Sequence, residues 1–99
     1  MKERIVVRKG AYHDSAFLMR ISRELQRLPG VQEAVVLMGS EMNRRLLADS
    51  GFAAPVLASA TPMDRVVALR AADELVLDEA ERELAKQLQG STAARSSAD

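Results

Sequence analysis

The sequence predicts a small α/β domain with the element order βαβαβα, in which the helices pack on a single sheet as a sandwich. Three short runs of β-branched and aliphatic residues, at residues 5–7, 31–38 and 65–70, alternate with three segments of helical periodicity. A chain of 99 residues fits one domain and contains no internal repeat. We favour a ferredoxin-like arrangement with a reduced sheet, because the strands are short and the second is entered through Pro29-Gly30-Val31. The alternative is a small open parallel sheet.

The composition of the chain excludes several classes of function. Fourteen basic residues balance fourteen acidic ones, which removes the general attraction that nucleic-acid and anionic-membrane binders show. We therefore expect no nucleic-acid partner and, since no apolar run approaches the roughly 20 residues that span a bilayer, no membrane partner. The absence of cysteine excludes a disulfide framework and a thiolate metal site, and it favours a reducing, cytoplasmic compartment.

The first strand and helix follow from local patterns. Residues 5–7 are bracketed by charged residues, and the strand is expected to stop at Gly10. Asp14 is a suitable N-cap for the first helix, and Pro29-Gly30 is expected to end it. The core stripe of this helix recurs at helical spacing at Leu18, Ile21, Leu25 and Leu28.

A second stripe on the first helix consists of Ser15, Met19 and Ser22. It lies about 100° around the helix from the core stripe. It predicts either a small-residue face that is open to a neighbour, or a core stripe that Met19 merely widens.

The second strand, Val31–Met38, has a continuous apolar run, which predicts that it is covered on both faces or central in its sheet. Gly39 lets the backbone turn without a Cβ penalty, and Ser40 is expected to cap a second helix. That helix closes at Asp49-Ser50-Gly51. Residues 52–60 are expected to form a connection with a short extended piece at residues 56–57.

The last third of the chain predicts a turn, a strand and a helix. Residues 61–64 (TPMD) have turn composition, and residues 65–70 predict a short central strand. Asp73 or Asp78 is expected to cap the last helix, and Gly90 to stop it. Residues 91–99 are small, polar and without periodicity, which predicts a disordered tail or the stub of a linker after a domain of residues 1–90.

The sequence contains no recognisable catalytic constellation. His13 is the only histidine, so we expect no metal site, and no serine lies in a nucleophile motif. Neither G-x-G-x-x-G nor a P-loop occurs. Two helix N-termini, at Asp14-Ser15 and Gly39-Ser40, offer backbone N–H groups to an anion, with Lys9 close to the first; the alternative is ordinary capping. Asn43 is expected either to bond a turn or a partner's backbone, or to be solvated.

Four motifs in order resemble the N-terminal region of the FdrA family of acyl-CoA synthetase-like proteins, which are relatives of the succinyl-CoA synthetase α subunit. They are residues 8–15 (RKGAYHDS), 18–25 (LMRISREL), 36–43 (VLMGSEMN) and 60–64 (ATPMD). The resemblance covers residues 5–90. It implies a region that precedes CoA-ligase-type domains, and in some members a link to allantoin catabolism through carbamoyl transfer from oxalurate.

The chain departs from that family pattern, since it contains neither the nucleotide-binding glycines nor the phosphohistidine segment of CoA ligases. No catalytic residue is therefore carried over. We expect no enzymatic activity from the chain by itself and no cofactor within it, with CoA or a nucleotide bound only in a complete complex.

We therefore predict a non-catalytic assembly or regulatory module of an FdrA-type acyl-CoA synthetase-like or carbamoyltransferase complex, with a protein partner or self-association. One alternative is a composite active site that another chain completes, and another is a small-metabolite sensor. The candidate ligand or interface residues are Lys9, Gly10, Asp14, Ser15, Met19, Ser22, Gly39, Ser40, Asn43, Thr61 and Asp64.

Overall fold

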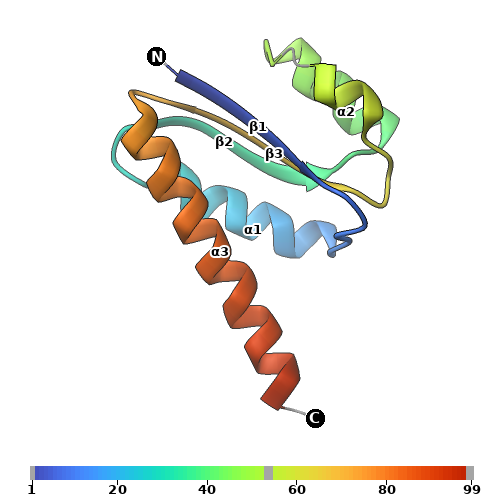
Figure 1. The fold of residues 1–99 in the computed structure, drawn as a ribbon, viewed down its shortest axis with the longest axis vertical. Helices are drawn as coiled ribbons and strands as arrows, with labels where there is room; N and C mark the ends of the chain where they lie inside the picture. Colours follow the sequence, from blue (N-terminus) through green and yellow to red (C-terminus); the bar gives the residue numbers. More distant parts are fainter. Residues whose placement is uncertain (1, 53–54, 98–99) are drawn as a thin grey trace.

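The structure, a computed structural model, describes residues 2–52 and 55–97, and the side chains of residues 2–52 and 55–89. The elements follow the predicted βαβαβα order, with one added 3-10 helix (Figure 1). They are β1 (Lys2–Arg8), α1 (Ser15–Gln26), β2 (Val31–Met38), α2 (Glu41–Asp49), η1 (Pro55–Ser59), β3 (Arg65–Ala71) and α3 (Glu74–Ser97). No helix in the described ranges is long and apolar enough to cross a membrane.

The described strands form one sheet in the order β1-β3-β2. β3 pairs antiparallel with both neighbours, so β1 and β2 run parallel to each other on either side of it. This split arrangement is that of a reduced ferredoxin-like sheet, as predicted. The alternative of an open parallel sheet is wrong, because every pair of adjacent strands in this sheet is antiparallel.

The central position in the sheet belongs to β3, as predicted, and β2 is an edge strand. The expectation that β2 is central is therefore wrong, whereas the expectation of cover on both faces is confirmed. Ala34, Val36 and Met38 face one hydrophobic core, and Val35 and Leu37 pack against the other. The continuous apolar run of β2 thus indicates that both faces of the strand are covered, and not that both of its edges pair with other strands.

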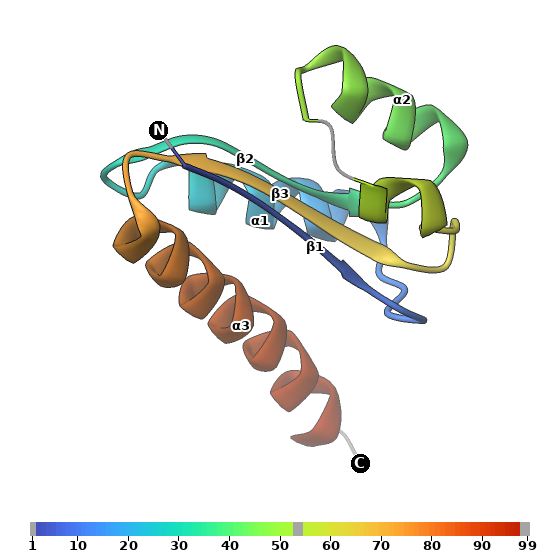
Figure 2. The same cartoon turned by 45° about the horizontal axis from the view of Figure 1, so that its top comes forward.

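Helices lie on both faces of the sheet (Figure 2). On one face, α1 and α3 bury Leu18, Ile21, Leu25, Leu77 and Ala80 against the sheet. On the other face, the segment from α2 to η1 contributes a smaller core of Leu47, Phe52, Leu57 and Ala60. The second core covers the end of the sheet near the β2 to α2 connection.

The start of α1 is capped as predicted. Asp14 accepts hydrogen bonds from the N–H groups of Ala16 and Phe17 at 3.1 and 3.3 Å. The predicted stripe is buried at Leu18, Ile21 and Leu25. The helix ends at Gln26, shortly before the predicted Pro29-Gly30 stop.

The connection after α2 differs from the prediction. Residues 53–54 of the predicted connection lie outside the described residues, and residues 55–59 form the 3-10 helix η1 instead of an extended piece. Pro55 occupies its first position, where a missing N–H costs nothing. Leu57 of this helix lies in the second core.

The last helix begins at Glu74, and Asp73 caps it by accepting the N–H of Val76 at 3.0 Å. The prediction that Gly90 stops this helix is wrong, since α3 continues to Ser97. A single glycine costs only about 1 kcal/mol in a helix interior, which a long helix tolerates. That residues 91–99 serve as a linker stays a prediction, and residues 98–99 lie outside the described residues.

Candidate functional site

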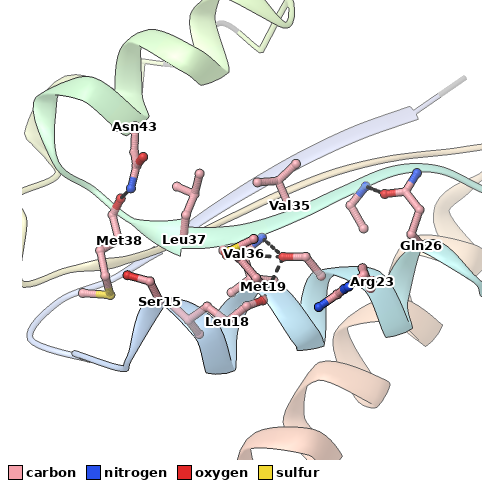
Figure 3. A pocket seen from close by; sticks show the side chains of 12 residues that line it. Ser15, Leu18, Met19, Arg23, Gln26, Val35, Val36, Leu37, Met38 and Asn43 are labelled. Carbon is pink, nitrogen blue, oxygen red and sulfur yellow. Dashed lines mark hydrogen bonds between the residues drawn. The ribbon is translucent and has the colours of Figure 1, made fainter.

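A groove of about 510 Å³ runs along the outer edge of β2, between this strand and α1 (Figure 3). Four of the predicted candidate residues line it together: Ser15, Met19, Ser22 and Asn43. The other lining residues are Leu18, Arg23, Gln26, Ala34, Val35, Val36, Leu37 and Met38. The second stripe of α1 is therefore the helical wall of a groove and not merely a widening of the core.

The backbone at the floor of the groove is already hydrogen-bonded by α1. Ser22 Oγ accepts the N–H of Val36 at 2.8 Å and lies 2.9 Å from the Leu18 carbonyl oxygen, to which it donates. Gln26 Oε1 accepts the N–H of Ala34 at 3.0 Å, and its Nε2 donates to the Gln32 carbonyl at 2.9 Å. Because these groups are satisfied, the edge of β2 offers side-chain surface rather than a free strand edge.

The exposed surface of the groove is mainly apolar. Met19 is 61% exposed on the α1 side. Val35 and Leu37 are half-buried and project from the opposite side of β2 to Leu18 (Figure 3). The Met19 thioether and the two aliphatic side chains thus lie on either side of the β2 edge, and the flexible thioether gives an adaptable apolar surface for a partner's hydrophobic side chains.

Asn43 fixes one end of the groove. Its Nδ2 donates to the Met38 carbonyl at 2.8 Å, at the end of β2. Its backbone N–H donates to Ser40 Oγ at 3.2 Å, so Ser40 is the predicted cap of α2. The Asn43 amide therefore bonds a turn, which is one of the two roles expected for it, and holds the first turn of α2 against the strand.

A second group of candidate residues gathers around the buried carboxylate of Asp64, which is 4% exposed. It accepts the N–H groups of Gly10 and Thr61, both at 2.9 Å, and the ammonium group of Lys9 at 3.0 Å. The N–H of Gly39 donates to the Asp64 carbonyl, also at 2.9 Å. We call these five residues the Asp64 junction; it joins the end of β1, the end of β2 and the turn before β3.

The donors of the Asp64 junction determine its chemistry. The N–H groups of Gly10 and then Thr61, with the charge of Lys9, hold the pKa of the Asp64 carboxyl well below its ordinary value despite its burial. The carboxylate is therefore ionised and fully engaged at neutral pH. Lys9 also donates to the Ser59 carbonyl at 2.6 Å, which further commits it to holding the turn.

Gly39 is required at the junction for a reason other than the one predicted. Its φ does not lie in the left-handed region. Instead, a Cβ at this position would lie 2.8 Å from the Cβ of Ala60 and 2.9 Å from the Thr61 carbonyl oxygen. Close approach of two backbone segments, rather than the turn itself, excludes a side chain here.

The helix N-terminus near His13 is occupied by protein groups. Asp14 already supplies the negative charge at the start of α1, with Ser15 in the first turn. His13 Nε2 lies 3.1 Å from a guanidinium nitrogen of Arg65. Burial, and next the charge of Arg8, lower the pKa of Arg65. These contacts favour ordinary capping over an anion site at this helix.

Eight of the lining residues were not among the candidates, and Gln26, Val35 and Leu37 are three of them. Gln26 continues the spacing of Ser15, Met19 and Ser22 by one further helical step, so the extended stripe could have identified it. The two strand residues carry no such signal, because the apolar run does not show which edge of β2 is open.

Comparison with known proteins identifies a family and a relative of this chain. A family model described as "AllF, heavy metal-associated domain" matches residues 1–99. The chain is also 36% identical over 69 residues to the uncharacterized protein YahF of Escherichia coli strain K12, an alignment that spans 70% of this chain and 13% of YahF. The chain thus spans only a small part of the length of this curated relative. No solved structure matches the chain.

Proposed function

The chain belongs to the AllF family of N-terminal domains described as heavy metal-associated, and from this premise we propose that it is a non-catalytic assembly or regulatory module of an FdrA-type complex. The large partner in this proposal is an acyl-CoA synthetase-like or carbamoyltransferase subunit or domain. The observation that carries the proposal is the apolar groove beside β2, which leaves Met19 61% exposed. A module that spans 13% of its relative YahF is of a size suited to an accessory role.

The engaged polar atoms support a non-catalytic role over a composite active site. Lys9, Gly10 and Thr61 bond Asp64, while Asn43 bonds the end of β2. General acid or base catalysis needs a group whose pKa lies near the working pH, and the pKa of Asp64 is moved away from that range. Replacing Asn43 or Asp14 by alanine is thus expected to reduce stability in the assembled complex before it changes turnover.

The family description raises the question of a metal, and the residues of this chain do not fit one. The chain has no cysteine, and the described residues contain no group of three His, Cys, Asp or Glu side chains that could hold an ion. Asp64 is surrounded by hydrogen-bond donors, and His13 faces the guanidinium of Arg65. The groups around Asp64 and His13 are N–H and cationic donors, whereas a soft metal ion prefers thiolate and thioether ligands. The proposal therefore includes no metal chemistry.

The groove suits a partner that supplies apolar side chains with a few polar contacts at the rim. Met19 lies between Ser15 and Arg23, which offer polar contacts beside it. Outside the groove, on the other face of the sheet, helix α2 also exposes Met42 and Leu46, which are 71% and 53% exposed and lie one helical turn apart. Apolar side chains of this kind are enriched at the centres of protein interfaces.

Co-purification with the large subunit tests the proposal. Met19→Glu places a charge in the groove, and we expect it to weaken the complex at least tenfold while the domain stays folded. Met63→Glu is the matched control, since Met63 is 57% exposed but does not line the groove. A wild-type chain that stays monomeric beside the large subunit and leaves its activity unchanged would remove the proposal.

A second candidate function, small-metabolite sensing, is favoured by the volume of the same groove. About 510 Å³ falls within the range of small-molecule sites, roughly 300–1,000 Å³. Calorimetry with CoA, acyl-CoA, carbamoyl phosphate and ATP tests it. A saturable heat of binding that is lost in Met19→Glu and kept in Met63→Glu would favour sensing. If none of the four compounds gives a heat of binding, assembly remains the proposed function.

The setting that we propose for this module is the cytoplasm, without nucleic-acid or membrane partners. The chain carries equal numbers of acidic and basic residues and no cysteine. Both features favour a protein partner in a reducing compartment.

A further inference from the structure

The outer edge of β1 is the one strand edge of the described sheet that no side chain closes. On β2, the outward N–H groups are those of Ala34 and Val36, which bond Gln26 and Ser22. Backbone groups alternate in direction along antiparallel strands, so the register places those of Glu3, Ile5 and Val7 on the outer edge of β1. Within the described residues, no side chain bonds these three backbone positions.

The burial of β1 reflects this open edge. Its four middle residues, from Arg4 to Val7, are only half-buried, whereas the other edge strand, β2, has three buried residues. Ile5 and Val7 pack against the second core and Val6 against the first, so both faces of β1 belong to the fold. The exposed feature is thus the row of backbone groups, which a further strand would pair.

The charges along β1 are uneven. Arg4 bonds Glu74, Asp78 and Glu81 of α3, and the bonds to Asp78 and Glu81 raise its pKa above the ordinary value. The exposed Lys2 and Arg8 lie on the same side of the strand as Arg4, and no carboxylate of the described residues pairs with either. The edge therefore presents an unpaired cation at each end, and between them lie the ion-paired Glu3 and Arg4 and the aliphatic residues 5–7.

A second copy of the chain does not fit this edge. Two copies related by a two-fold axis would pair their β1 strands antiparallel. Three registers pair most of the strand and keep Glu3, Ile5 and Val7 in the hydrogen-bonded positions. The first sets Lys2 opposite Arg8, the second sets Arg4 opposite Arg4, and the third sets Arg4 opposite Arg8. Like charges directly opposite each other destabilise a strand pair, so the charge pattern opposes self-pairing.

Helix α3 also runs away from this edge. A helix of 24 residues is about 36 Å long, whereas a strand of 7 residues spans about 23 Å. Figures 1 and 2 show that α3 diverges from the sheet, so that its last turns lie away from β1. A strand supplied by another polypeptide therefore fits the edge more directly than one that follows α3.

We propose that the outer edge of β1 binds an extended segment of a partner polypeptide as a fourth, antiparallel strand, with acidic side chains opposite Lys2 and Arg8. The segment would take the hydrogen bonds of Glu3, Ile5 and Val7 and lay aliphatic side chains beside Ile5 and Val7. The proposal rests on the assembly function and adds to it a contact that is separate from the groove. A preference for acidic segments also disfavours pairing between two copies of the chain, because both copies present the same basic edge.

A synthetic peptide tests the edge without the large subunit, so its outcome is independent of the co-purification result. The probe is the heptapeptide EVTVTKE, which places glutamates opposite Arg8 and Lys2 and valines opposite Val7 and Ile5. We expect amide hydrogen exchange to slow at least tenfold at Glu3, Ile5 and Val7, and to stay unchanged at Ala34 and Val36. The control peptide KVTVTKK has lysines in place of the glutamates and is expected to bind at least tenfold more weakly.

Two variants locate the site. Arg8→Glu is expected to weaken binding of the acidic peptide at least tenfold, and Arg20→Glu, an exposed change on α1, to leave it unchanged. Ile5→Pro removes an outward N–H, which an edge strand tolerates, and is expected to abolish binding in a folded chain. Absence of protection at Glu3, Ile5 and Val7, protection at Ala34 and Val36 instead, or equal binding of both peptides would overturn the proposal.

Discussion

The Asp64 carboxylate accepts the backbone N–H of Gly10 at 2.9 Å, across a separation of 54 residues. This bond joins the segment after β1 to the turn before β3, and the Thr61 N–H and Lys9 ammonium complete the set of donors. One buried side chain thereby holds the two connections that flank the second core. The Asp64 carbonyl also accepts the N–H of Gly39, which follows the groove residue Met38 directly, so the junction is tied to the end of β2.

The stability of the domain is expected to fall in acid through Asp64. The pKa of its carboxyl is lower in the folded chain than its ordinary value of 3.8, so the unfolded chain binds the proton first. The stability that the Asp64 carboxylate contributes is therefore complete when the pH is above the ordinary pKa. It is lost as the pH falls through the ordinary pKa toward the lowered pKa of the folded chain. Urea unfolding at pH 7, 4 and 3 measures this loss.

Asp64→Asn serves as the control for the acid prediction. Its amide oxygen still accepts an N–H, but we expect the variant to be less stable at pH 7 and to show a flatter pH dependence below pH 4. Equal pH dependence in the variant and the wild type would show that other carboxylates control acid unfolding.

The sequence predicts the order of elements well because each signal is local. Asp14 and Ser40 precede their helices and cap them as predicted. Lys9, Gly10, Thr61 and Asp64 were all candidates, yet their meeting around one carboxylate depends on the order β1-β3-β2. No spacing in the sequence encodes that order.

The errors of the sequence analysis arise where tertiary packing overrides local pattern. The apolar run of Val31–Met38 predicted either cover on both faces or a central position, and only the first holds, because the second core covers Val35 and Leu37. Leu57 enters that core from a 3-10 turn, although its neighbours favoured an extended piece. Gly90 looked like a stop signal, yet helix α3 continues through it.

Gly39→Ala is expected to lower the free energy of unfolding by about 1–3 kcal/mol, the usual cost of overpacking. The new methyl group would lie 2.8 Å from the Ala60 Cβ and 2.9 Å from the Thr61 carbonyl oxygen, which is backbone and cannot rotate away. Urea denaturation measures the loss. The double variant with Ala60→Gly is expected to recover part of it, and strictly additive effects would contradict the direct contact.

Ser22→Ala is expected to open the edge of β2 at a cost of about 1–2 kcal/mol, because the Val36 N–H loses its acceptor at 2.8 Å. The exchange rate of the Val36 amide should rise with it. Ser15→Ala is the matched control on the same stripe; Ser15 is exposed, and its loss should cost less than about 0.5 kcal/mol. An unchanged Val36 exchange rate in Ser22→Ala would show that the hydroxyl is not the group that closes this edge.

Zinc is expected to leave the thermal stability of the domain unchanged, in spite of the family's description. A site that binds only the folded state adds about 2.7 kcal/mol at a metal concentration of 100 times its dissociation constant. For a domain of this size, that corresponds to a rise in melting temperature of at least about 10 °C. Melting with 100 µM Zn²⁺ and with EDTA therefore detects any micromolar site. A rise that His13→Ala removes would identify a metal ligand at His13 and overturn the argument from the donor set, whereas equal melting temperatures would support a family member that works without a metal.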